Sequence, residues 1–221
     1  MMSRLLAAAE RNALLELKTG TVSDALDSLG LAGGCAGLRP LSPHMRMVGP
    51  ALTLRYLPRG TTDGTVGEFL HLAAPGDVIV IDNRGRLDCT VWGEILSTFS
   101  HQMKIAGTVI DGVSRDVDVA LEIGYPIFSR GPHMITGKGR IALEQVNGPV
   151  SVGDIRVEPS DIICGDASGI VAIPSHRLND VIARAQEIAA VEHKLHNDVA
   201  RGTELAAARA AHRYHDLQVR R

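Results

Sequence analysis

The chain has 221 residues, 45% of them apolar, so it can bury a sizeable core as one large domain or two small ones. Its 23 basic and 25 acidic residues, with three Phe, three Tyr and one Trp, exclude the positive field and the base-stacking surface of a nucleic-acid binder. No apolar run has the length of a membrane span, and three widely spaced cysteines indicate reduced thiols, so we expect a soluble cytoplasmic protein with no membrane partner.

Helical spacing of apolar residues predicts two short helices at the start of the chain. The first is expected at residues 5–17. The second lies in TVSDALDSLG, where Thr21 is the expected N-cap, Asp24 follows three residues later, and Gly30 ends the helix.

The middle of the chain alternates between strand-like and helix-like runs. Short buried strands separated by single helices are typical of βαβ units with parallel strands. The expected elements are strands at residues 51–57, 78–82, 107–111 and 127–128, and helices at residues 64–73, 93–104 and 115–123.

A β-rich segment and then helices follow. RIALEQV, DIRVEP, DIICGD and GIVAIP are short strand-like runs joined by turn residues. We therefore expect an α/β fold in which an αβ domain covers residues 1–175 and a helical C-terminal extension of the same domain covers residues 176–221. Apolar residues on one face of the extension are Leu178, Val181, Ile182, Ala185, Ile188 and Ala189, and Arg201-Gly202 interrupts the helix before TELAAARAAHRYHDL resumes it.

The stretch VWGEILSTFSHQMKIAGTVIDGVSRD carries the residues best suited to chemistry. If residues 107–111 form a strand, DGVS is the loop at its carboxyl end, where open α/β sheets bind their ligands. Arg115 and Asp116 would then begin the next helix and point about 100° apart. One could hold a carboxylate while the other holds a metal, without the two neutralising each other.

The preceding helix would begin at Gly93-Glu94-Ile95-Leu96, and its free N–H groups and dipole form an anion site. Gly93 lets an anion come close, and Glu94 can orient a water or act as a base. Carboxylates without nearby His or Cys favour a hard cation such as Mg²⁺ or Mn²⁺, which would stabilise an enolate formed from a small 2-oxo acid. On the alternative, purely structural interpretation, Asp116 only stabilises its helix, and Arg115 and Glu94 are solvated.

Glu94 is followed by 20 residues and then by Arg115-Asp116, and this spacing resembles the acid-x20-Arg-Asp signature of the RraA-like / HMG aldolase family. The resemblance covers residues 21–174. It implies a β/β/α swivelling-type sandwich assembled as a homotrimer or homohexamer, with active sites between subunits. Other stretches that agree, in the same order, are TVSDALDSLG, VGPALTL, PGDVIVID, WGEIL, GTVIDGVSRD, FSRG and VEPSDIICGDASGIVAIP.

The resemblance further implies a class II pyruvate aldolase that uses Mg²⁺ or Mn²⁺ and also decarboxylates oxaloacetate. By position, Asp116 would ligate the metal, Arg115 would bind the pyruvyl carboxylate and polarise the ketone, and Glu94 would hold a metal-bound water. The amides of Glu94, Ile95 and Leu96 would hold the substrate carboxylate. The family also contains the regulator of ribonuclease E activity A, so a non-catalytic protein-binding role is the alternative, and metabolite binding without turnover is a third.

The chain departs from the family pattern at Asp88, where the family often has Arg, and this puts recognition of a second substrate carboxylate in doubt. Glu94 stands where Asp is commoner, which keeps the charge but lengthens the reach. Two other patterns are discounted. GKGRIA precedes a strand-like run and so fails as a dinucleotide motif, and the pairs His193/His196 and His212/His215 lack a third metal ligand.

Overall fold

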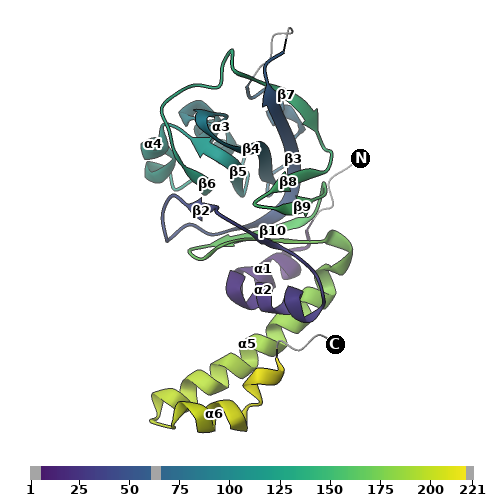
Figure 1. Cartoon of the computed structure of the whole chain (residues 1–221), viewed down its shortest axis with the longest axis vertical. Coiled ribbons are helices and arrows are strands. Elements are labelled where there is room, and N and C mark those ends of the chain that lie inside the picture. The colour runs from purple at the N-terminus through teal and green to yellow at the C-terminus, as the bar shows by residue number, and fades with distance from the viewer. Residues whose placement is uncertain (1–5, 61–65, 218–221) are drawn as a thin grey trace.

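The computed structural model describes residues 6–60 and 66–217, and they form a mixed sheet with helices packed against it (Figure 1). The helices are α1 (Ala8–Glu16), α2 (Thr19–Ser28), α3 (Glu94–Gln102), α4 (Val117–Glu122), α5 (Leu178–Ala200) and α6 (Leu205–Ala211), with 3-10 turns at Leu70–Leu72, Ser175–Arg177 and Tyr214–Asp216. The strands are β1 (Gly34–Cys35), β2 (Arg39–Pro40), β3 (Met47–Pro58), β4 (Val78–Thr90), β5 (Gly107–Ser114), β6 (Ile127–Pro132), β7 (Ile141–Val146), β8 (Val150–Val152), β9 (Ile155–Val157), β10 (Ile162–Asp166) and β11 (Gly169–Ile173).

Parallel strands form the centre of the sheet, as the alternating pattern predicted. The order is β1-β11-β10-β3-β4-β5-β6-β2, in which β3, β4, β5 and β6 run parallel and the outer pairs run antiparallel. β7 also pairs with β3, and β8 and β9 form a separate hairpin. The mixed α/β fold class with a helical C-terminal segment is therefore confirmed, whereas the domain boundary at residue 175 stays a prediction.

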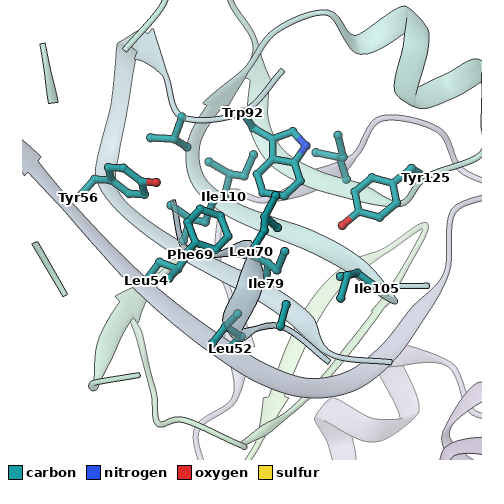
Figure 2. Packing of buried hydrophobic residues seen from close by; sticks show 14 of the residues in the cluster. Leu52, Leu54, Tyr56, Phe69, Leu70, Ile79, Trp92, Ile105, Ile110 and Tyr125 are labelled. Atoms are coloured by element: carbon teal, nitrogen blue, oxygen red, sulfur yellow. The ribbon is translucent and has the colours of Figure 1, made fainter. Parts of the chain in front are cut away.

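Apolar side chains gather in three clusters. The first lies between the sheet and α3 and α4, and in it the Trp92 ring is flanked by Phe69 and Tyr125 (Figure 2). The second lies on the other face of the parallel strands, against β8 and β9. The third joins β10 and β11 to α1, α2 and α5, beyond which α5 and α6 extend away from the sheet (Figure 1). Because both faces are covered, Val78, Ile79, Val80 and Ile81 of β4 are all fully buried.

Two buried carboxylates hold the β8–β9 hairpin against the sheet. Asp82 and Asp111 are register partners on β4 and β5. Asp111 pairs with Arg130 and accepts a hydrogen bond from the Gly153 N–H at 2.9 Å. Asp82 lies 3.6 Å from Arg55 Nε and accepts a bond from the Ser151 N–H at 3.3 Å. Each charge is thus compensated, as buried carboxylates require.

Three predictions about local structure were wrong. Thr21 is not the N-cap of α2, because the helix begins at Thr19, whose N–H and hydroxyl donate to Asp166 of β10 at 2.8 and 2.6 Å. Among the described residues of the expected 64–73 helix, only the 3-10 turn at residues 70–72 forms, while residues 64 and 65, like residue 5 of the first expected helix, lie outside the described residues. DGVS is not a loop, since β5 continues to Ser114.

The C-terminal helices agree with the apolar stripe and the break at Arg201-Gly202. Leu178, Val181, Ala185 and Ile188 are buried on α5, with Arg184 among them. Within residues 6–60 and 66–217, no helix is both long enough and apolar enough to cross a membrane.

Candidate active site

The predicted site residues meet where α3 begins and β5 ends. The Arg115 N–H donates to the Trp92 carbonyl oxygen at 3.0 Å, which fastens the turn after β5 to the residue before Gly93. Parallel strands place their carboxyl ends at one edge of the sheet, and a helix that follows such a strand starts at that edge. Gly93-Glu94 and Arg115-Asp116 are therefore neighbours in space.

The core fixes this junction through Trp92. Its ring is 2% exposed and stacks on Tyr125 with the ring centroids 6.2 Å apart (Figure 2). Its Nε1–H donates to Ser97 Oγ at 2.9 Å, and that hydroxyl donates to the Gly93 carbonyl oxygen at 3.1 Å. The start of α3 thus has a defined position relative to the hydrophobic core.

Asp116 adopts a conformation that differs from the prediction. Arg115 and Asp116 do not begin a helix, because Asp116 is the left-handed N-cap of α4 with φ 53° and ψ 44°, and α4 starts at Val117. Its side chain does not cap α4 and turns toward α3 instead. There Asp116 Oδ2 accepts a hydrogen bond from the Glu94 N–H at 3.3 Å and lies 3.2 Å from Arg115 Nε. The expectation that Arg115 and Asp116 would not neutralise each other is therefore wrong.

Gly93 makes this approach possible. It is the N-cap of α3 and supplies no capping side chain, so the first-turn N–H groups have no side-chain cap. Anion binding by the amides of Glu94, Ile95 and Leu96 stays a prediction. A Cβ atom at Gly93 would lie 2.7 Å from Asp116 Oδ2 and 3.1 Å from Arg115 Nε. Its φ of −152° is ordinary extended backbone, so the glycine is needed for space and not for conformation.

The carboxylates suit a hard divalent cation. Glu94 is exposed and the Asp116 side chain is 34% exposed, so both can reach a ligand from solvent. Among the described residues, no three His, Cys, Asp or Glu side chains are grouped as a complete metal site. A set of one or two carboxylates fits Mg²⁺ or Mn²⁺, which keep several waters and take further oxygens from the substrate.

Asp88, the departure from the family pattern, forms a two-pronged ion pair. Its carboxylate oxygens lie 2.9 and 2.7 Å from Nε and Nη2 of Arg86. These hydrogen bonds lower the pKa of Asp88 to about 2. The Arg86 charge is therefore compensated within the chain.

Buried polar groups that sequence reasoning missed lie close to this junction. Ser114, the residue before Arg115, is fully buried, and its hydroxyl has no hydrogen-bond partner among the described residues. Asn83 is equally buried, with both side-chain polar atoms unpartnered among those residues, and its Nδ2 would be 3.0 Å from a Cβ at Gly112. The only signal in the sequence is that each residue comes after a run of mostly apolar residues in its strand, in VIVIDN and TVIDGVS.

Comparison with known proteins shows the family of the chain. A family model described as RraA-like, Aldolase/RraA, matches residues 19–172. A Halalkalibacterium halodurans protein named "Putative 4-hydroxy-4-methyl-2-oxoglutarate aldolase" is 34% identical over 77% of this chain and 79% of its own length. Protein DlpA of Legionella pneumophila is 37% identical over 81% of this chain, and the chain spans only 30% of that relative.

A solved structure shares the fold. The crystal structure of an uncharacterized protein from Pseudomonas syringae superposes with a TM-score of 0.86 at 37% identity, covering 92% of this chain and 98% of that one. The family model extends over most of the chain and includes Gly93, Glu94, Arg115 and Asp116. The chain therefore belongs to the RraA-like family.

Proposed function

We propose that the chain is a divalent-metal-dependent lyase that cleaves a 4-hydroxy-2-oxo acid to pyruvate by a retro-aldol reaction and also decarboxylates oxaloacetate. The convergence of Arg115, Asp116 and the Glu94 amide at the start of α3 is the observation that carries this proposal. Membership of a family described as Aldolase/RraA and the name of the Halalkalibacterium relative support the aldolase reaction.

Each residue has a role that its chemistry allows. Arg115 and the N–H groups at the start of α3 hold the 2-oxo acid carboxylate, and Arg115 polarises the ketone. Asp116 holds Mg²⁺ or Mn²⁺, with Glu94 acting through a water. The cation supplies stabilisation of the negative charge that collects on the ketone oxygen.

Cleavage also needs a proton transfer. Glu94 lies at the same helix end with an exposed carboxylate, so it can act as the base, directly or through a water. The substrate 4-hydroxyl loses its proton and becomes a carbonyl as the C3–C4 bond breaks. The bond electrons form the enolate of pyruvate, which then takes a proton at carbon.

We also propose assembly as a homotrimer or homohexamer with sites between subunits. Exposed apolar side chains lie on α3 and α4, the two helices that begin at the site: Ile95 is 77%, Phe99 46% and Leu121 45% exposed. Such side chains are commonly covered in an assembly. We place the protein in the cytoplasm, which agrees with three buried cysteines that are all free thiols.

The test is pyruvate release from oxaloacetate and from 4-hydroxy-4-methyl-2-oxoglutarate, with Mg²⁺ or Mn²⁺ and with EDTA. Turnover should require the cation and should be lost in Asp116→Ala and Arg115→Ala. Asp118→Ala is the matched control, since Asp118 is an exposed carboxylate two residues away in the first turn of α4. Turnover that survives EDTA or Asp116→Ala would refute the proposal.

The family description also names RraA, so a protein-binding role is the second candidate. Binding through the outer surface would not depend on Asp116. Absence of turnover on either substrate, together with partner binding unchanged in Asp116→Ala, would favour that role over the lyase.

A further inference from the structure

Asp116 Oδ2 contacts two hydrogen-bond donors that the proposed function assigns to the substrate carboxylate. Asp116 Oδ2 lies 3.3 Å from the Glu94 amide nitrogen and 3.2 Å from Arg115 Nε. A backbone N–H at a helix start and an Arg guanidinium are the groups that bind a carboxylate ligand. Asp116 therefore binds to the site as an incoming 2-oxo acid would.

The two carboxylates cannot share this position. The distance of 2.7 Å from Oδ2 to a Cβ at Gly93 shows that the oxygen sits in the space opened by the missing side chain. A second carboxylate oxygen at the same donors would contact the first with the same charge. A substrate carboxylate that binds the Glu94 N–H and Arg115 Nε must therefore displace the Asp116 side chain.

We propose that Asp116 closes the carboxylate site of this chain and that a divalent cation opens it by drawing the Asp116 carboxylate away from Glu94 and Arg115. The inference rests on the proposed function and adds an order of binding: the cation first, the 2-oxo acid second. Asp116 is thus both the cation ligand and the internal competitor of the substrate.

The side chain is placed to make this movement. Asp116 does not cap α4, so turning it away from α3 breaks no bond within its own helix. Its side chain is 34% exposed and that of Arg115 38%, so neither is locked by packing. Once Asp116 turns to a cation, the Glu94 N–H and Arg115 Nε are released together. Cation and substrate affinities are then linked, and each raises the other.

Pyruvate binding in EDTA tests the closing contact, that of Asp116 Oδ2 with the Glu94 N–H and Arg115 Nε, without any cation that could itself bind pyruvate. Binding to the full-length chain would be measured by calorimetry, and by the fluorescence of Trp92, the single tryptophan, which precedes Gly93. Asp116→Gly removes the competing carboxylate, and glycine adopts a φ of 53° without strain. Asp116→Asn keeps the shape and tolerates that conformation, while thermal unfolding verifies that both variants fold.

We expect Asp116→Gly to bind pyruvate in EDTA at least about fivefold more tightly than the wild type, with Asp116→Asn in between. Asp118→Ala removes the same charge nearby and should leave affinity within about twofold, because exposed charges interact weakly. Equal affinity in wild type and Asp116→Gly would overturn the inference, and so would an equal gain in Asp118→Ala.

The same proteins separate this inference from the lyase proposal. Metal-dependent turnover by the wild type without tighter binding in Asp116→Gly would leave the lyase standing and remove the closing contact. Tighter binding in Asp116→Gly without wild-type turnover would keep the closing contact and refute the lyase.

Discussion

Replacing Gly93 by Ala should damage the site while leaving the fold intact. The added Cβ would lie 2.7 Å from Asp116 Oδ2 and 3.1 Å from Arg115 Nε, whereas ordinary contacts begin at 3.4 Å. Because the φ of Gly93 is −152°, alanine fits the backbone. The methyl group blocks the position from which any carboxylate oxygen, of Asp116 or of a substrate, reaches the Glu94 N–H.

The size of the effect follows from these contacts. A substrate carboxylate oxygen that takes the position of Asp116 Oδ2, 3.3 Å from Glu94 N, would be pushed away from that N–H by the methyl group and would lose this hydrogen bond. A hydrogen bond to a charged group contributes about 1.5–3 kcal/mol, and the partial exposure of this site reduces the loss to about 1–2 kcal/mol. That loss corresponds to a decrease of about 5- to 30-fold in kcat/KM.

The assay is metal-dependent pyruvate release, with the Tm measured on the same samples. Gly20→Ala is the matched control, since a Cβ at Gly20 of α2 would have no atom within 4 Å, and it should keep full activity. Both variants should keep the Tm within a few degrees of the wild type. A Gly93→Ala protein that folds and retains wild-type kcat/KM would refute the steric argument.

Three further results are expected. Ser114→Ala should raise the free energy of unfolding by about 1 kcal/mol in urea titrations, because the buried hydroxyl lacks a partner among the described residues; a lower stability would show that the hydroxyl is bonded. Burial raises the pKa of the Cys35 and Cys164 thiols to about 12, so unfolding releases their protons above pH 9. The free energy of unfolding should then fall as the pH rises from 9 toward 12, by up to about 1.4 kcal/mol per pH unit for each thiol. Cys164→Ala should make this pH dependence less steep. Arg184→Ala should cost about 2–3 kcal/mol, since Arg184 binds Ser28 Oγ and the Leu217 carbonyl oxygen at 3.1 and 2.6 Å; Arg177→Ala, which breaks an exposed pair with Asp180, should cost under about 1 kcal/mol.

Elements with a clear pattern of apolar residues could be predicted from the sequence, because burial of those residues determines where they form. The continuous apolar runs of β4 and β5 and the stripe of α5 are set by burial. The start of α2 could not be predicted, since the group that binds Thr19 is Asp166, 147 residues away. Arg184 interrupts an apolar face and is stabilised by partners on other segments, so spacing alone gave no reason to expect it buried.

The error at Arg115 has a physical cause of the same kind. Asp is among the preferred N-cap residues, so a helix beginning after Asp116 was equally compatible with the sequence. What decides the conformation is the contact of the Asp116 carboxylate with Glu94 N–H and Arg115, which depends on the α3 start lying beside β5. Local preference therefore selected residues that the structure brings together, and it predicted the wrong backbone for two of them.

The spacing of the site residues stayed informative because it reflects chain geometry and not the conformation of any one residue. From Glu94 the chain runs through α3, about 14 Å long for 9 residues, and a short connection. It then returns along β5, about 26 Å for 8 residues. The helix and the connection must together span the length of β5 in the opposite direction, so that Arg115 ends beside Trp92 and Gly93. Both ends of this interval are held at one place, since the Arg115 N–H binds the Trp92 carbonyl oxygen, and for this reason the interval of 20 residues indicates a site where either motif alone would not.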